Sequence, residues 1–514
     1  MTPMATKPAE PPASQASTTL KPLITAAEMY PALEEMILQA RTEVLLAFRI
    51  LDARTALRSK AAQEAGLTSW ADLLEDAAER GVRVRLLLSD FDPVFTPDLH
   101  REAWGSAGRF AARLNAHPSA ELICALHDCA PAPIWERVFS PQINDRLAEL
   151  RSAPHEYLTR SQLRALDGHY RLRPVTLHQK FAVIDRERAV IGGIDIDERR
   201  FDDHDHDQRP EDTWHDVSMA VTGPVIAQIV RHFADCWDRS RAECGTVFSE
   251  TVTDLPDIPE AGETDPDAPD LLRTVSSHLD QFFRFGPVTD VKEHETAHFE
   301  AFAQAEHSIY IETQFFRHMP LARALARRAA EVPDLQLILV TPTEPERVIF
   351  GRDNGMDARH AQALQLRCLA HLRKAFGDRI AVVSPVQPRP APDGTPMPLA
   401  GSAVIYLHSK VTLIDESVGI VGSANLNGRS LLWDTEASVR FREADAIRHL
   451  RQRLARKWLG SAPGDPEMAA TWTSAARVAA AAPPEERRSM ILPYPVKRNR
   501  RFARYVPILP AAMF

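Results

Sequence analysis

The chain has 514 residues, of which 44% are hydrophobic and 25% are charged. These values are ordinary for folded proteins and exclude a mostly disordered chain, a collagen and a coiled-coil rod. The length predicts two or three domains. The formal net charge of −9 argues against non-specific binding to nucleic acid, although it leaves room for a small basic pocket.

The N-terminal segment 1–21 is rich in Pro, Ala, Ser and Thr and has neither an apolar core nor a basic start. It predicts a disordered tail rather than a signal peptide. No run of about 20 apolar residues follows, so we expect no transmembrane helix. The sequence therefore predicts a protein that is soluble and cytoplasmic when made. Peripheral contact with a membrane, or secretion without a signal peptide, stays open.

Helices and strands are predicted to alternate through the first half of the chain. An amphipathic pattern predicts a helix over 26–43, and the apolar run at 43–51 has the length of a strand. Residues 69–93 predict a further helix, a glycine at its end (Gly81) and a strand. This alternation is typical of an α/β sandwich with a mixed or largely parallel sheet flanked by helices.

The same order of elements returns in the second half, with a helix, a strand, a helix and a strand predicted over 294–342. Between the halves, an acidic and Pro-rich stretch has no periodic apolar pattern and is interpreted as a linker. We therefore divide the chain into a disordered tail (1–21), a first domain (22–249), a linker (250–270), a second domain (271–460) and a C-terminal extension (461–514).

Two further segments each allow two interpretations. The insert around 98–150 has apolar residues that suit either a core contact or a lid over a pocket. The C-terminal tail at 496–514 mixes basic with aromatic residues. That mixture suits a membrane surface carrying anionic lipid, but we favour a tail packed over the second domain.

Neither the cysteines nor the acidic segments predict a metal site. The Asp- and His-rich segment 197–212 matches no EF-hand spacing, so we favour a solvated loop over a Ca²⁺ or transition-metal site. The cysteines contain no C-x2-C pair, so we predict buried free thiols instead of a zinc ribbon. They are Cys124, Cys129, Cys236, Cys244 and Cys368.

The strongest internal repeat is a short one. Residues 177–185 read LHQKFAVID, and residues 407–415 read LHSKVTLID. Each copy is followed by a glycine-containing strand, AVIGGID at 189–195 and VGIVGSAN at 418–425. A spacing of about 230 residues is too long for a solenoid, so the repeat predicts two similar domains that face one another.

Strand geometry places the polar residues of each copy. Residues i and i+2 of a strand point to the same face, so His178 shares a face with Lys180, and His408 shares one with Lys410. Asp185 comes seven residues after His178, which on a continuous strand puts it on the opposite face and about 23 Å away, at about 3.3 Å per residue. We therefore expect it to support the fold or a turn.

Two histidines and two lysines on such faces suit the chemistry of a phosphodiester. The lysines neutralise the non-bridging oxygens, while one imidazole attacks phosphorus and the other protonates the leaving alcohol. Because side chains supply the positive charge, we expect no metal and no other cofactor to be required.

The two copies resemble the signature of the phospholipase D superfamily, the HKD family, which reads H-x-K-x4-D followed by G-S-x-x-N or a G-G variant. The similar stretches cover roughly residues 25–460, including WHDVSMAVTGP at 214–224, IYIETQFF at 309–316 and NLNGRSLLWDTEASV at 425–439. The matching residues are His178, Lys180, Asp185, Gly192, Gly193 and Asp195 in the first copy, and His408, Lys410, Asp415, Gly422, Ser423 and Asn425 in the second.

The resemblance implies a role for each motif residue. It assigns His178 as the nucleophile that forms a phosphohistidine, and His408 as the general acid and then base, although the two roles can be exchanged. Asp216 and Glu436 stand where the family places a carboxylate behind each histidine, which fixes the tautomer and stabilises the imidazolium. A strand-end acid with no such role is the alternative for each. Lys180 and Lys410 complete the catalytic set.

Residues after each motif are implied to bind phosphate or to support the site. These are Ser423 and Asn425 in the second copy, with Gly193 and Asp195 at the corresponding places in the first. Because the first copy lacks the Ser and Asn of the signature, the two halves are not expected to bind phosphate equally. Gly192 and Gly193 allow close approach of another part of the backbone. Asp185 and Asp415 are motif residues with structural roles.

Two neighbouring stretches complete the implied site. An Arg-aromatic-Asp element, Arg200 to Asp202, belongs to a loop near the active site. Glu312 and Gln314 alternate on a strand near the pocket, with a structural and a substrate role both open.

The sequence thus predicts two similar α/β sandwich domains with the active site at their interface. The resemblance implies a phospholipase D that hydrolyses phosphatidylcholine-like glycerophospholipids to phosphatidic acid and the free head group, with transphosphatidylation to alcohols. A cardiolipin-synthase-like phosphatidyltransferase and a superfamily nuclease are the alternatives, and two intact motifs argue against an inactive scaffold. We expect a phospholipid at a membrane surface as the partner, no nucleic acid, no stable protein partner and a monomer.

Overall fold

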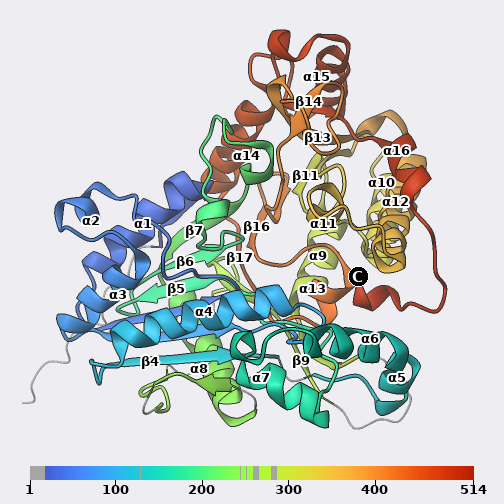
Figure 1. The fold of residues 1–514 in the computed structure, drawn as a ribbon. Coiled ribbons are helices and arrows are strands. Elements are labelled where there is room, and N and C mark those ends of the chain that lie inside the picture. Colours follow the sequence, from blue (N-terminus) through green and yellow to red (C-terminus); the bar gives the residue numbers. More distant parts are fainter. Residues whose placement is uncertain (1–17, 128, 244, 250–251, 259–264, 279–285) are drawn as a thin grey trace, which may run out of the picture.

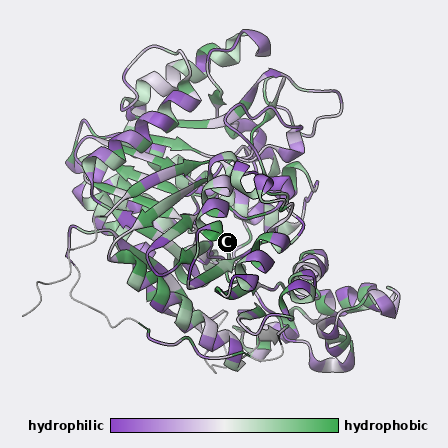
Figure 2. Cartoon of the chain, turned by 90° about the vertical axis from the view of Figure 1, so that its left-hand side faces the viewer, coloured by the Kyte–Doolittle hydropathy of each residue, from purple (hydrophilic) through white to green (hydrophobic). Residues whose placement is uncertain are grey.

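The computed structural model describes residues 18–127, 129–243, 245–249, 252–258, 265–278 and 286–514. They form two mixed β-sheets, each flanked by helices, so the predicted α/β fold is confirmed (Figure 1). Figure 2 shows that hydrophobic residues concentrate on the strands, whereas loops and the outer helices are more hydrophilic.

The first sheet has the strand order β1-β7-β6-β5-β2-β3-β4-β8. Strands β2, β3 and β4 are parallel, and the other pairings are antiparallel. The strands are β1 (Leu20–Ile24), β2 (Glu43–Phe48), β3 (Arg83–Ser89), β4 (Ala120–Ala125), β5 (Phe181–Ile184), β6 (Arg188–Gly192), β7 (Val217–Thr222) and β8 (Gly245–Val247).

The second sheet repeats this plan with the order β10-β9-β17-β16-β15-β11-β12-β13-β14, and β18 also pairs with β13. Again three central strands, β11, β12 and β13, are parallel. The strands are β9 (Asp270–Ser277), β10 (Val288–Lys292), β11 (Ser308–Glu312), β12 (Gln336–Val340), β13 (Ile380–Pro390), β14 (Ser402–Val404), β15 (Val411–Ile414), β16 (Val418–Gly422), β17 (Glu436–Phe441) and β18 (Ile491–Pro493).

Helices cover the outer face of each sheet and also fill the space between the sheets. Apolar residues of α1, α3 and α4 pack on the first sheet, and those of α9, α10 and α12 pack on the second. A third core joins both sheets through α8, α14 and α15. These helices are α1 (Ala26–Leu38), α3 (Trp70–Glu79), α4 (Pro97–Leu114), α8 (Val225–Glu243), α9 (Glu293–Gln304), α10 (Met319–Glu331), α12 (Met356–Phe376), α14 (Ala444–Leu459) and α15 (Ala469–Ala481).

Shorter helices lie in the connections: α2 (Lys60–Glu64), α5 (Pro133–Val138), α6 (Ser140–Arg151), α7 (Arg160–Arg164), α11 (Glu346–Ile349), α13 (Gly428–Leu432) and α16 (Val496–Phe502). Local sequence signals explain several boundaries. Helix α3 begins with a capping box, in which Ser69 and Asp72 accept each other's backbone N–H groups. The chain leaves it through Gly81 at φ 83°, as the sequence predicts.

Three segments at the predicted domain boundaries take part in the folded structure. Strand β1 begins at Leu20, inside the segment predicted as a disordered tail, because it pairs with β7. The described parts of the predicted linker are not all exposed, since Leu255 is buried in the shared core and Asp270 opens β9. The C-terminal extension packs on the second domain, because β18 pairs with β13.

The two ambiguous segments both pack on the protein. In the insert, α4 and β4 belong to the first sheet layer, while α5 and α6 follow as surface helices. The tail ends with Phe514 packed against Ala361 and Leu364 of α12. Among the described residues, no helix combines the length and the apolar character that crossing a membrane would require. Cys124, Cys236 and Cys368 are buried free thiols, Cys129 is also buried, and Cys244 lies outside the described residues.

Candidate active site

The two motif histidines meet where the sheets meet. His178 lies just before β5, and its backbone N–H donates to the carbonyl of Thr435 at 2.8 Å. His408 lies just before β15, and its backbone N–H donates to the carbonyl of His215 at 2.7 Å. Each bond belongs to a short parallel bridge between the halves. Each motif is therefore fixed to the segment that precedes the other half's acidic residue.

These bridges produce a crossed pairing of histidines with carboxylates. His178 Nδ1 lies 3.0 Å from Glu436 Oε2, and His408 Nδ1 lies 2.6 Å from Asp216 Oδ2. Both pairs are largely buried, with 12% of the His178 side chain exposed and less of the others. Nε2 of neither motif histidine has a hydrogen-bond partner among the described residues, so it is the ring atom left to react.

Burial and nearby cations set the protonation of this cluster. The pKa of His178 is lowered well below its usual range, by burial first and then by lysine and arginine charges. His408 shows the same direction, with burial and the charge of Lys410 as the main causes. Burial raises the pKa of both partner carboxyls, Asp216 and Glu436, while the nearby lysine charges oppose this shift and favour the carboxylate forms. Both motif imidazoles are therefore neutral near pH 7.

The two lysines lie beside the histidines, directly before β5 and β15. Lys180 Nζ donates to the carbonyl of His178 at 2.6 Å, and Lys410 Nζ donates to the carbonyl of His408. Both side chains are buried. Burial lowers the pKa of Lys410 to about 7 and lowers that of Lys180, while the charge of Asp195 opposes the shift at Lys180.

In each half, one residue after the motif lies against the carboxylate of the same half and fits its length. In the second half, Ser423 Oγ donates to Glu436 and accepts the Ala437 N–H. In the first half, Gly193 takes the place of the serine. A Cβ there would lie 2.8 Å from Cγ of Asp216 and closer still to Oδ1. Gly193 thus leaves the room that the Asp216 carboxylate occupies.

Asn425 and Asp195, which stand at corresponding places, have different partners. Asn425 donates to Gln314 Oε1 at 3.3 Å. Asp195 is fully buried, and its carboxylate accepts the Ile50 N–H at 2.9 Å and lies 3.5 Å from Arg200. A carboxylate engaged in this way would repel an anionic phosphate, so this geometry favours support of the site for Asp195 over phosphate binding.

The motif aspartates lie at the far end of their strands and hold turns. Asp185 accepts the backbone N–H groups of residues 41–43, and Asp415 accepts those of residues 306–308. Both have positive φ, 53° and 47° respectively. Neither contacts the histidine of its own motif.

The Asp- and His-rich segment 197–212 is mostly exposed or half-buried, as a solvated loop would be, but Asp202 and His206 are buried in a chain of polar contacts. Asp202 Oδ2 lies 2.6 Å from His206 Nδ1, and His206 Nε2 lies 3.3 Å from Nδ1 of His215. His215 Nε2 lies 3.3 Å from Glu312 across the interface. Among the described residues, no group of three or more His, Cys, Asp and Glu side chains could hold a metal ion.

The site also contains Trp214 and Tyr406, which the sequence analysis did not select, beside Arg200 and Gln314, which it did. The Trp214 ring packs against the His408 ring at 4.8 Å, and the Arg200 guanidinium lies 4.4 Å from the Trp214 ring. Trp214 stands two residues before Asp216, a position that could have suggested its place. Gln314 donates to the Tyr406 hydroxyl at 2.6 Å.

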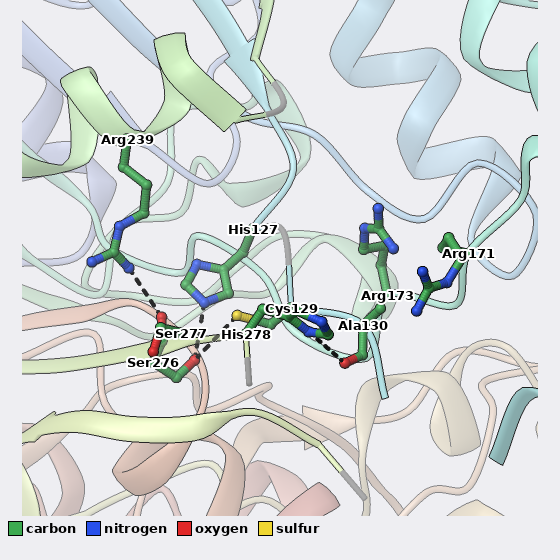
Figure 3. Close-up of a pocket in the computed structure, with 9 residues that line it drawn as sticks. All are labelled: His127, Cys129, Ala130, Arg171, Arg173, Arg239, Ser276, Ser277 and His278. Atoms are coloured by element: carbon green, nitrogen blue, oxygen red, sulfur yellow. Dashed lines mark hydrogen bonds between the residues drawn. The ribbon is translucent and has the colours of Figure 1, made fainter. Parts of the chain in front are cut away.

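A separate basic cavity of about 330 Å³ lies behind the site and contains neither motif histidine. Figure 3 shows Arg239 on one side and Arg171 and Arg173 on the other. His127 connects it to the site, because His127 Nδ1 lies 3.0 Å from Oγ1 of Thr435, whose carbonyl accepts the His178 N–H. Its lining residues are His127, Cys129, Ala130, Arg171, Arg173, Arg239, Ser276, Ser277 and His278.

Comparisons with known proteins agree with the motifs. The profile of the family described as "Cardiolipin synthase, PLD-like domain" matches residues 33–237 and 299–458. Phospholipase D1 of Saccharomyces cerevisiae is 24% identical over 375 residues, covering 55% of this chain and 22% of that protein. Phospholipase D gamma 1 of Arabidopsis thaliana is 21% identical over 398 residues, covering 55% and 45%. The chain therefore spans less than half the length of these relatives.

A solved structure resembles the whole arrangement. The crystal structure of phosphatidylserine synthase from Haemophilus influenzae Rd KW20 has a TM-score of 0.51 and 13% identity, with 85% of each chain covered. At this identity the likeness concerns the fold alone. The matched segments include both histidine motifs and both paired carboxylates. The chain thus belongs to the family described as cardiolipin synthase, PLD-like domain, within the phospholipase D superfamily.

Proposed function

We propose that this chain is a phospholipase D that transfers the phosphatidyl group of a glycerophospholipid to water or to an alcohol. The observation that carries the proposal is the crossed pair of histidine–carboxylate contacts, which places two free Nε2 atoms and two buried lysines in one site. The names of the two curated relatives described above, both phospholipases D, support the same chemistry.

The first step is attack by one histidine on phosphorus. Nε2 of neutral His178 forms an N–P bond, the P–O bond to the head group breaks, and His408 gives the leaving oxygen a proton from Nε2. Glu436 accepts the Nδ1–H of His178 and stabilises the positive charge that the ring acquires. The lysines neutralise the non-bridging oxygens.

The second step reverses the proton transfer. His408 removes a proton from water or an alcohol, whose oxygen forms a new P–O bond as the N–P bond breaks. His408 must carry a proton at the first step, although burial keeps it neutral in the free protein. The bound phosphodiester supplies a negative charge beside the ring, which raises its pKa. The resemblance, and not this geometry, assigns the nucleophile to His178.

Phosphatidyl transfer to another lipid is the second candidate, because the matched family is described as cardiolipin synthase. It uses the same steps and differs only in the acceptor alcohol. A nuclease is less favoured because the net charge of −9 opposes binding to nucleic acid.

The test is to incubate the purified protein with phosphatidylcholine vesicles and ethanol, without added metal, and to separate the lipids. Phosphatidic acid together with phosphatidylethanol is the expected result. Conversion of phosphatidylglycerol to cardiolipin instead would favour the transferase. Absence of any lipid product with either substrate would contradict the proposal. His178→Ala and His408→Ala are the inactive controls.

A further inference from the structure

The internal repeat allows residues of the two halves to be compared position by position. Strands β2 and β5 pair with Val44 opposite Ile184, and β11 and β15 pair with Ile309 opposite Ile414. Ile184 and Ile414 each precede the motif aspartate, so Val44 and Ile309 are equivalent. Five residues further along each chain stand Arg49 and Gln314. These two residues therefore occupy corresponding places beside the two motifs.

Arg49 and Gln314 differ in charge, and so do the residues next to them in the site. In the second half, Gln314 is fully engaged through Asn425 and the Tyr406 hydroxyl. In the first half, Arg49 and Asp195 stand at the places of Gln314 and Asn425. A neutral amide pair in one half thus corresponds to a pair of opposite charges in the other.

Arg49 does not form the ion pair with Asp195 that their opposite charges would favour. Asp195 binds the Ile50 N–H and lies within ion-pair distance of Arg200, not of Arg49. Within the described part of the chain, Arg49 Nε is buried without a hydrogen bond, and the guanidinium lies 5.1 Å from the Phe91 ring. Arg429, a second arginine near His178, differs because it donates to Asp434.

The backbone next to Arg49 is tied to the first motif, because the Ile50 N–H donates to Asp195, and the Arg49 charge acts on the reacting group. Arg49 is among the charges that lower the pKa of His178 and of Lys180. The charged side chains that act most strongly on His178 are Lys180, Arg49, Lys410 and Arg429, and Glu436 faces its Nδ1. A guanidinium with a buried, unpaired Nε near the charge of Lys180 is unfavourable in the empty site. An anion with oxygen acceptors would relieve the repulsion and supply the missing hydrogen bond.

We propose that Arg49 is a third phosphate-binding cation of this site, which donates to a non-bridging oxygen of the phosphoryl group while that group is attached to His178. This inference rests on the proposed phosphodiester chemistry. It gives the first half a contact that Gln314 cannot supply in the second, because an amide donor carries no positive charge. The site would therefore bind the phosphoryl group unequally, with more positive charge on the side of His178.

The decisive variant is Arg49→Gln, which installs the residue found at the corresponding place in the second half. Removing one donor of this kind is expected to lower kcat about 100-fold or more. Arg49→Lys keeps the charge and is expected to recover part of the rate. The matched control is Arg83→Gln, at the exposed start of β3. Urea unfolding of each variant measures whether the fold is retained.

Two readouts separate phosphate binding from a structural role. Without Arg49 the pKa of His178 rises, so the acid limb of kcat/KM moves to higher pH in Arg49→Gln but not in Arg49→Lys. Calorimetry with inorganic phosphate should show binding about 10-fold weaker in Arg49→Gln, a loss of about 1.4 kcal/mol, and unchanged in Arg83→Gln.

The phosphate measurement also distinguishes this inference from the proposed function. A wild-type protein that makes no lipid product but binds phosphate through Arg49 would contradict only the lipid assignment. Phosphate binding by Arg49→Gln equal to that of the wild type overturns the inference, whatever the lipid activity. An unchanged acid limb in Arg49→Gln overturns it as well. If Arg49→Gln does not fold, Arg49→Lys and Arg49→Met are compared instead. Phosphate binding that is equally strong in these two variants overturns the inference.

Discussion

Gly193→Ala is expected to inactivate the site by displacing the carboxylate of Asp216. The added Cβ would lie 2.8 Å from Cγ of Asp216 and nearer to Oδ1. Because carbon atoms prefer separations of about 3.5–4.0 Å, the Asp216 side chain must retreat by roughly 1 Å. The 2.6 Å contact with His408 Nδ1 then exceeds hydrogen-bond distance.

The magnitude follows from the role of that contact. Loss of the carboxylate that orients a catalytic histidine costs about 10⁴ in kcat in serine proteases, or about 5 kcal/mol of barrier. We therefore expect Gly193→Ala to lose at least about 10³ in kcat, because His408 loses both its orientation and the stabilisation of its charged form. The loss should match that of Asp216→Ala, and combining the two changes should add little, since both remove one interaction.

The assay is release of head group from phosphatidylcholine vesicles under saturating lipid. Gly108→Ala is the matched control, because a Cβ at that position in α4 meets no atom within 4 Å and its activity should stay at the wild-type level. Urea unfolding checks that both variants are folded. Retention of more than about a tenth of the wild-type kcat by folded Gly193→Ala would refute this account of the glycine.

Three other predictions concern the carboxylates and the buried histidines. Asp216→Asn should lower kcat by about 10²–10⁴ with little change in unfolding free energy, measured by lipid turnover and urea unfolding; equal turnover would contradict the orienting role. Glu312→Gln should lower the unfolding free energy, measured in urea, by about 2–4 kcal/mol. The reason is that an amide cannot accept all the hydrogen bonds that Tyr310, Ser409 and Trp458 donate to the carboxylate. An unchanged unfolding free energy would contradict this role of Glu312. His232 and His294 have pKa values lowered to about 3 by burial. Since the unfolded chain binds these protons from about pH 6.5 downward and the folded protein does not, stability should fall by about 2 kcal/mol per histidine between pH 7 and pH 5. Measured in urea, the slope should be shallower in His294→Gln, and an unchanged slope would argue against a neutral buried His294.

The sequence predicts the fold well because the signals for it are local or repeated. Alternating helical and strand periodicities, with Gly81 after α3, identify the α/β layers. The duplicated histidine motif identifies two halves, and alternation along a strand places His178 with Lys180. The boundaries are less predictable, since Leu255 lies in a Pro-rich acidic stretch but is buried by helix and strand residues distant in sequence.

The crossed pairing in the site depends on contacts that no local pattern encodes. His178 and Glu436 are 258 residues apart, and His408 and Asp216 are 192 apart. Only the short bridges between the halves decide which carboxylate meets which histidine. The acidic segment before Trp214 shows the same limitation. The sequence favours a solvated loop there, whereas the fold buries His206 of this segment between Asp202 and His215.

The differences between the halves matter because the proposed reaction is itself asymmetric. One histidine must attack phosphorus while neutral, and the other must carry a proton at the same moment. Two identical half-sites would give both rings the same pKa and no preferred direction. In this protein the backbone bridges and histidine–carboxylate contacts follow a common plan, and the departures concern charge and side-chain length beside them. The first half has Gly193 and Asp216 where the second half has Ser423 and Glu436. It also has Arg49 and Asp195 where the second half has the amides of Gln314 and Asn425. The duplicated strands can therefore supply matched positions for the reacting atoms, while the unmatched neighbours give each histidine a different environment.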